Sequence, residues 1–370
     1  MYQKDFVMPK AVYLLNHSVG RPQQSLRQAF DEHFFLPWQG SGREPWGDWL
    51  AVVEDFRIQL ARLFNSDAKL FCPQVNLSSG LTKLVQSLPR LTRPGAVILM
   101  SENDFPSMGF ALRQALPEAE LRFIPADQDV SLLETWRPHL SADIDLVFIS
   151  HAYSNTGQQA PLAELLPQVR ALGALSLVDV AQSAGVLPLD LSALAPDFLL
   201  GSSVKWLCGG PGAAYLWVNG EQLAACQPRD VGWFSHENPF EFDIHDFRYH
   251  DSALKFWGGT PSVAPYAMAA HSISYFADLG SAKVRQHNLM QLERIWDLLG
   301  EAVRSPRGAS RCSGTAILHF GERQSQVLEA LTQANISLDV RQQGMRISPH
   351  IYNGEQDMQI LLEALSPFSG

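Results

Sequence analysis

Lys205 is the residue of this sequence whose surroundings are best suited to chemistry. It follows the apolar run DFLLGSS (197–203) and precedes a turn at Gly209 and Gly210. A lysine among apolar and small residues is poorly solvated, which disfavours its ammonium form and leaves a nucleophilic amine. An exposed loop lysine is the alternative interpretation. The strand, serine and glycine context favours an amine able to form a Schiff base.

Asp179 and Gln182 form a second candidate. Asp179 lies in the apolar run LSLVDVA (175–181), and Gln182 follows three residues later. A carboxylate at the end of a buried strand needs a hydrogen bond or an opposite charge. It either caps the following turn or stabilises a protonated ring nitrogen of a cofactor. Gln182 is placed to donate a hydrogen bond into the same pocket.

Ser78 and Ser79 stand just before the apolar pattern of a helix expected over 80–89. Hydroxyls and free backbone N–H groups at the start of a helix form an anion site. An ordinary N-cap explains either serine equally well. Beside a Schiff-base lysine, phosphate binding becomes the preferred interpretation.

The elements around these residues alternate between strands and helices. Most of the expected strands are apolar on both faces, which is typical of strands covered by helices on both sides. This alternation predicts an open, mostly parallel α/β sheet, whose ligands bind outside the carboxyl ends of its strands. The expected strands are 96–102, 121–126, 145–151, 175–181, 197–203 and 213–219, and the expected helices include 107–116 and 161–173.

The chain is expected to divide into three parts. Residues 1–40 form an N-terminal segment that packs with a small domain or with a partner chain. Residues 41–265 form the large cofactor-binding α/β domain. Residues 266–370 contain a connecting helix, expected over 284–300, and a small C-terminal α+β domain with the order β-α-β-α.

Composition excludes several classes of function. The chain is 46 % hydrophobic and 18 % charged, which suits a sizeable core, and its 28 basic and 38 acidic residues give a net charge of −10. We therefore expect no nucleic-acid partner. Without about 18 consecutive apolar residues, a membrane span is not expected. Four cysteines without a C-x-x-C pair suit the cytoplasm. The acidic and histidine cluster at 243–251 matches no metal-ligand spacing, so no metal is expected.

Taken in order, these motifs resemble the fold-type I pyridoxal-phosphate (PLP) enzymes of the class V aminotransferase family. The resemblance is closest to its kynureninase-like and isopenicillin-epimerase-like branch. It implies a seven-stranded, mostly parallel sheet, bound PLP, and a homodimer with shared active sites. The pieces that carry it are 13–20, 78–80, 104–106, 150–151, 179–185, 203–206, 232–233, 259–261 and 346–349.

The resemblance also implies a role for each matching residue. Lys205 resembles the Schiff-base lysine, and Asp179 the partner of the ring nitrogen. Phe105 resembles the aromatic residue that stacks on the ring, and Thr260 the residue that reaches the phosphate of the neighbouring subunit. Arg346 resembles the arginine that binds the substrate α-carboxylate through its planar fork. The other implied contacts are with the cofactor for Gln182, Ser78, Ser79, Ser202 and Trp233, and with the substrate for Asn16 and His151.

We therefore expect an aminotransferase that acts on an amino acid through Lys205. A kynureninase-like hydrolase, or another PLP lyase or epimerase, is the alternative. Three positions depart from the kynureninase pattern: Val204 stands where Tyr is usual, Gln182 where His is usual, and Met108 where Asp is usual. A silent PLP-binding regulatory protein is the non-enzymatic alternative, and retention of both Lys205 and Arg346 argues against it.

Overall fold

A seven-stranded sheet forms the centre of the larger part of the molecule. The computed structural model describes residues 2–369. The sheet has the order β2-β8-β7-β6-β5-β3-β4, in which β8 alone runs antiparallel to its neighbours. This confirms the predicted fold class. The strands are β2 (Phe71–Gln74), β3 (Val97–Ser101), β4 (Glu120–Ile124), β5 (Leu146–Ser150), β6 (Leu175–Asp179), β7 (Phe198–Ser202) and β8 (Ala214–Val218).

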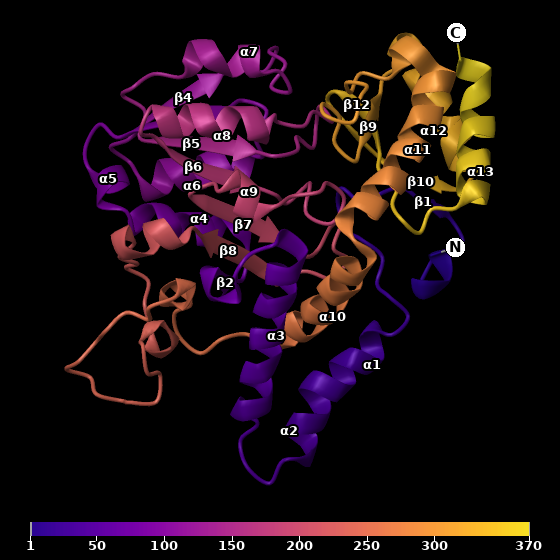
Figure 1. Ribbon diagram of the computed structural model, residues 1–370. Helices are drawn as coiled ribbons and strands as arrows, with labels where there is room; N and C mark the ends of the chain where they lie inside the picture. Colours follow the sequence, from indigo (N-terminus) through magenta and orange to yellow (C-terminus); the bar gives the residue numbers. More distant parts are fainter. Residues whose placement is uncertain (1, 370) are drawn as a thin grey trace.

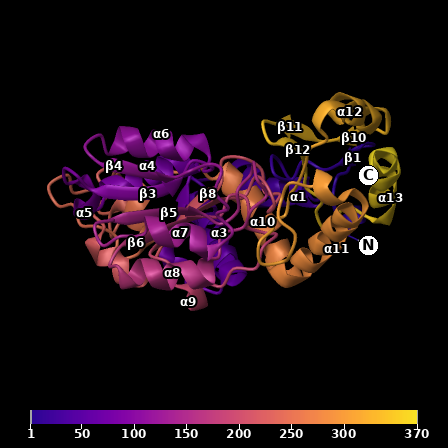
Figure 2. The ribbon, with the colours of Figure 1, turned by 90° about the horizontal axis from the view of Figure 1, so that it is seen from above.

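Helices cover both faces of this sheet (Figures 1 and 2). The strands carry apolar side chains on both of their faces, and each face therefore needs a covering layer. In β3, Ile98 and Met100 pack toward one layer, whereas Val97 and Leu99 pack toward the other. The first layer holds α4 (Leu77–Gln86), α5 (Pro89–Thr92) and α6 (Pro106–Ala115). The second holds α7 (Leu133–Trp136), α8 (Leu162–Ala171) and α9 (Leu191–Leu194).

Two long helices, α3 (Trp46–Phe64) and α10 (Ala264–Leu279), pack against each other below the sheet (Figure 1). The sequence analysis did not predict α3, although its buried residues recur with helical spacing. The short helices α1 (Leu26–Phe30) and α2 (Leu36–Gly40) lie on either side of a π-helical turn at Asp31–Phe35, and α1 packs on α10.

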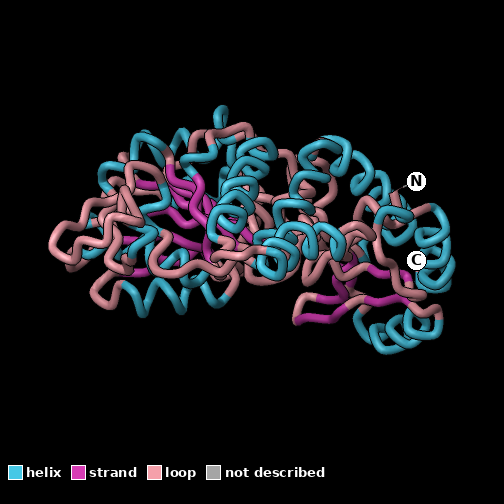
Figure 3. The backbone as a smooth tube through the Cα atoms, turned by 90° about the horizontal axis from the view of Figure 1, so that it is seen from below, coloured by secondary structure: helices cyan, strands magenta, loops and turns pink. Residues whose placement is uncertain are grey.

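The C-terminal part contains a second, smaller group of strands, which Figure 3 displays apart from the main sheet. Its antiparallel sheet has the order β11-β12-β9, and α12 and α13 pack together beside it. The expected β-α-β-α order is present, with the short strands β10 and β11 added before the second expected strand. The elements are α11 (Ser281–Leu299), β9 (Ala316–Leu318), α12 (Gln324–Gln333), β10 (Ile336–Ser337), β11 (Asp339–Arg341), β12 (Gly344–Ile347) and α13 (Glu355–Leu365).

The N-terminal segment joins this smaller part. Strand β1 (Val12–Tyr13) pairs in parallel with β10, and Leu15 bridges to Ser348. The predicted domain boundaries at residues 40 and 265 stay predictions. Within residues 2–369, no helix combines the length and the apolar character needed to cross a bilayer.

Candidate active site

A cavity of about 210 Å³ opens at the carboxyl ends of the central strands. Its walls come from the segments that follow β3, β5, β6 and β7 and from the start of α4. Six of the predicted site residues line it together. They are Ser78, Phe105, Asp179, Gln182, Ser202 and Lys205.

Lys205 lies in the turn after β7, where the N-terminal segment crosses its backbone. The Gly20 N–H donates to the Val204 carbonyl at 2.9 Å, and a Cβ on Gly20 would lie 2.1 Å from the Lys205 carbonyl oxygen. Burial lowers the pKa of Lys205 to about 8, with Asp179 opposing this shift and Arg346 adding to it. The neutral amine is therefore far more populated near neutral pH than in a fully solvated lysine.

Phe105 presents its ring to the cavity. The ring is 57 % exposed, although it follows a buried strand, and the Lys205 Nζ lies 5.9 Å from its centroid. A core phenylalanine would be covered by protein atoms. The exposed ring therefore leaves an apolar face beside the reactive amine.

Asp179 ends β6 and is buried at the cavity wall. Burial raises the pKa of Asp179, while the hydrogen bond from the Ala181 N–H (2.8 Å) and the charge of Lys205 partly oppose that rise. The backbone of Asp179 also accepts the N–H of His151 at 2.9 Å. The two sequence interpretations of this residue are compatible, since Asp179 caps its turn and still lines the cavity.

In the turn before α4, one residue caps the helix and a different residue lines the cavity. Asn76 is the N-cap, because its Oδ1 accepts the Ser79 N–H at 2.8 Å. Ser78 lines the cavity, whereas Ser79 does not. Ser202 and Gln182 line it from other walls, and the Gln182 Nε2 donates to the His17 carbonyl at 3.0 Å.

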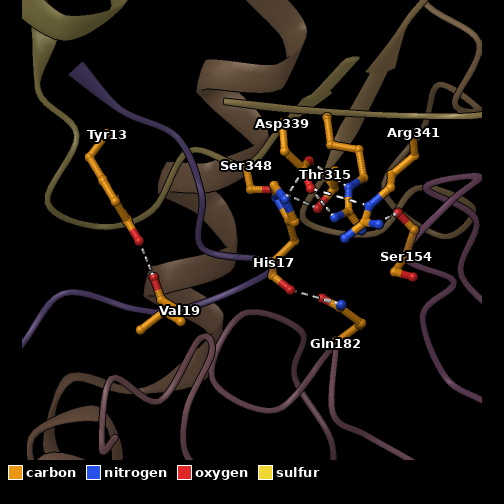
Figure 4. Close-up of polar contacts among 10 residues, drawn as sticks. Tyr13, His17, Val19, Ser154, Gln182, Thr315, Asp339, Arg341 and Ser348 are labelled. Atoms are coloured by element: carbon orange, nitrogen blue, oxygen red, sulfur yellow. Dashed lines mark hydrogen bonds and ion pairs between the residues drawn. The ribbon is translucent and has the colours of Figure 1, made fainter. Parts of the chain in front are cut away.

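Arg346 lies beside the cavity on β12. Its guanidinium donates through Nε to Asp339 Oδ1 at 2.8 Å and through Nη2 to the second oxygen of Asp339. Its Nη1 is 3.4 Å from the carbonyl of Ser154, a residue of the cavity wall. Figure 4 displays Asp339 and Ser154 among the side chains of this part of the molecule that polar contacts connect.

The remaining predicted residues lie outside the cavity. Asn16 is buried and donates to the Ser348 carbonyl at 2.7 Å. Burial, with a smaller contribution from Arg285, lowers the pKa of His151 to about 3. Trp233 lines a separate hollow, and Thr260 is exposed on the loop before α10.

The sequence analysis missed two residues: Tyr153, which lines the cavity, and Asp104, which stands between the lining residues Asn103 and Phe105 in the sequence. Burial outweighs hydrogen bonding and raises the pKa of Asp104 to about 7, although its carboxylate accepts the Ser101 N–H at 2.7 Å. The Tyr153 hydroxyl is buried at the cavity without a hydrogen-bond partner among residues 2–369. Asp104 follows an expected strand directly, which was the available signal. Among the same residues, no group of three or more His, Cys, Asp or Glu could hold a metal ion.

Comparisons with known proteins agree with this geometry. The family model described as Aminotransferase class-V matches residues 47–361. An uncharacterized aminotransferase, YcbU of Bacillus subtilis, is 24 % identical over 329 residues, which cover 87 % of this chain and 85 % of that protein. A kynureninase of Deinococcus radiodurans is 26 % identical over 290 residues, which cover 75 % of this chain and 68 % of that protein.

Solved structures share the fold. A C-DES mutant with glycine covalently linked to its PLP cofactor superposes with a TM-score of 0.83. It is 21 % identical to this chain, and the match covers 96 % of each. The arrangement of the sheet, helices and C-terminal part is therefore the same fold as that of this structure.

Proposed function

Because this chain belongs to the class V aminotransferase family, we propose that it transfers the amino group of an amino acid, with Lys205 as its reactive amine. The protein is an enzyme, and its cofactor is pyridoxal 5'-phosphate. One observation carries the proposal. Lys205, whose lowered pKa favours the neutral amine, lines the same cavity as Asp179.

The residues of the cavity fit this cofactor. Phe105 offers an exposed aromatic face for the ring, and Asp179 offers a buried carboxylate for its nitrogen. Ser78, at the start of α4, and Ser202 offer hydroxyls for the phosphate. The unpartnered Tyr153 hydroxyl supplies a further donor. When bound, PLP supplies a carbonyl for the lysine amine and a protonated ring that withdraws electrons.

Three side chains of this protein have separate roles toward the substrate and the cofactor. The Lys205 amine would be placed to accept the proton from the substrate Cα. Asp179 keeps the proton on the ring nitrogen, which its negative charge favours. Arg346 holds the α-carboxylate, since a planar fork of donors suits that group.

Amino transfer is supported by the likeness to an aminotransferase and by three departures from kynureninase. Val204, Gln182 and Met108 stand where that branch carries other residues. Hydrolysis of a kynurenine-like substrate is the second candidate. The likeness to a kynureninase and the stretch at 232–240 favour it.

A substrate screen tests both candidates. Purified protein loaded with PLP is mixed with single amino acids and with kynurenine in a stopped-flow absorbance instrument. Amino transfer should convert the cofactor to its amine form and release an oxo acid, which a coupled dehydrogenase detects. Release of anthranilate from kynurenine with the cofactor unchanged would overturn amino transfer in favour of hydrolysis.

We also propose a homodimer in which Thr260 serves the neighbouring subunit. An apolar surface supports this proposal: Phe242 and Ile244 are 75 % and 91 % exposed on the loop before α10, and Trp38 is 56 % exposed on α2. Patches of this kind mark protein interfaces. Light scattering should give twice the chain mass, and Thr260→Ala should weaken PLP binding. A monomer that keeps full PLP affinity would contradict the proposal.

A cytoplasmic location is proposed as well. All four cysteines are buried thiols, which suits a reducing compartment.

A further inference from the structure

The carboxylate of Asp339 holds the guanidinium of Arg346 along one edge. We propose that Asp339, itself held by His17, is a positioning residue that orients Arg346 so that its free edge faces the substrate carboxylate. This inference rests on the proposed function, because it assigns a support to the carboxylate-binding arginine of that same site.

The pairing is built into the small antiparallel sheet. Asp339 of β11 and Arg346 of β12 are direct cross-strand partners in register. Opposite charges at such positions attract each other. Arg346 is 6 % exposed, and a cation this buried requires a compensating charge. Hydrogen bonds from Arg346 and His17 outweigh burial and hold the pKa of Asp339 below its usual range, so that its negative charge is permanent near neutral pH.

The geometry leaves one edge of the guanidinium available. Asp339 takes Nε and Nη2, the side-on edge. Among residues 2–369, Nη1, at the opposite end, has only the 3.4 Å contact with the Ser154 carbonyl at the cavity wall. A guanidinium has five N–H donors, so Nη1 and the second N–H of Nη2 remain for a two-donor contact with a carboxylate. The edge that is free is therefore the one nearest to the cavity.

His17 prevents Asp339 from turning away. Its Nε2 lies 2.9 Å from Asp339 Oδ1, and its Nδ1 lies 2.7 Å from the Ser348 hydroxyl. The Ser348 hydroxyl is in turn 2.7 Å from the hydroxyl of Thr315. Burial lowers the pKa of His17, so the neutral ring donates to Asp339 from Nε2 and accepts from Ser348 at Nδ1. Figure 4 displays this chain of side chains.

The same histidine connects the arginine to the cofactor cavity. Its backbone carbonyl accepts the Gln182 amide at 3.0 Å, and Gln182 lines the cavity. The N-terminal segment, the small sheet and the end of β6 thus meet at one residue. A rigid connection of this kind sets the distance between the carboxylate-binding edge and the reactive amine.

Binding of a carboxylic acid without an amine tests this role separately from turnover. The PLP-loaded protein is titrated with 3-phenylpropionate and with its amide, 3-phenylpropionamide, and the cofactor absorbance reports the Kd. Asp339→Asn should weaken binding of the acid about tenfold and leave the Kd of the amide unchanged. His17→Gln keeps a donor for Asp339 and should lose less affinity than His17→Ala. If Asp339→Asn does not fold, the two His17 variants carry the test.

Arg341→Gln is the matched control, because Arg341 also approaches Asp339, at 3.4 Å, but is exposed and takes no part in the proposed chain. It should bind the acid as the wild type does. Equal or tighter acid binding by Asp339→Asn would overturn the positioning role, since Asp339 would then be neutral or a competitor for Arg346. Unchanged acid binding by Arg346→Ala would instead overturn the carboxylate-binding role of Arg346, and the positioning role with it.

Discussion

Two aspartates of this protein experience opposite electrostatic environments. Asp179, at the cofactor cavity, is buried with one backbone donor and a nearby lysine, and its pKa is raised. Asp339, in the small sheet, receives two donors from Arg346 and one from His17, and its pKa is lowered despite partial burial. Burial disfavours both charges, but only the small sheet supplies enough donors to reverse its effect.

The difference separates residues prepared for reaction from residues that hold others in place. Incompletely compensated groups gather in and beside the cavity. Lys205, which lines it, has a pKa of about 8, and the buried Asp104, which stands between the lining residues Asn103 and Phe105 in the sequence, has a pKa of about 7. Such perturbed values are typical of groups that exchange protons. The Asp339–Arg346 pair is compensated within the chain, so its charges persist over a wide pH range.

Asp179→Asn should cause the largest loss, because an amide cannot hold the cofactor ring protonated. We expect kcat to fall at least ~100-fold, which corresponds to roughly 3 kcal/mol in the activation barrier. Steady-state kinetics on the best substrate of the screen measures this.

The comparison with Asp339→Asn sharpens that result. The small-sheet variant should raise KM and leave most of kcat, since it disturbs a binding group. Equal effects of the two variants on kcat would break the distinction between the two regions.

The pH dependence of cofactor attachment should follow Lys205. Only the neutral amine attacks a carbonyl, so below a pKa of about 8 the rate of PLP incorporation into the apo-protein should fall about tenfold per pH unit. The absorbance of the bound cofactor follows this rate. Because Asp179 raises this pKa and Arg346 lowers it, Asp179→Asn should shift the midpoint down and Arg346→Gln should shift it up.

Pyridoxamine phosphate provides the control for that experiment, because it has no carbonyl to react with the amine. Its rate of binding should lack the midpoint near pH 8. An incorporation rate for PLP that is constant from pH 6 to pH 8 would contradict a lysine with a lowered pKa.

Asp104→Asn should change the stability of the fold, by an amount that depends on pH. The folded-state pKa of Asp104 is raised, so between about pH 4 and 7 the folded protein binds more protons than the unfolded chain, and the wild type loses stability as pH rises. An asparagine does not titrate. The free energy of unfolding of Asp104→Asn should therefore increase relative to that of the wild type, by up to ~1.4 kcal/mol per pH unit across this range.

Denaturant unfolding of the apo-proteins measures this gain. Asp339→Asn should behave oppositely, because a lowered pKa contributes stability above about pH 4 that is lost as pH falls. The loss of unfolding free energy that Asp339→Asn causes should become smaller as the pH falls. A stability difference for Asp104→Asn that does not change with pH would show that this carboxyl is not held protonated.

Local sequence signals were sufficient for six of the seven strands of the central sheet and for the residues at the ends of those strands. The apolar runs that end near Asp179 and Ser202 predict buried strands, and a parallel sheet brings the ends of such strands together. Lys205, Asp179 and Phe105 could therefore be assigned to one cavity before the structure was considered. The edge strand β2 was not predicted, because its four residues include a proline and carry little periodic signal.

The support of Arg346 depended on tertiary structure alone. His17 and Asp339 are 322 residues apart, and neither lies in a motif that predicts the other. They meet because β1 pairs with β10, which places the N-terminal segment beside the small sheet. The sequence by itself determined which side chains are chemically competent, since desolvation by apolar neighbours is a local property. Only the folded chain decided which edge of Arg346 faces the cavity, because a hydrogen-bonded charge pair requires partners at fixed distances.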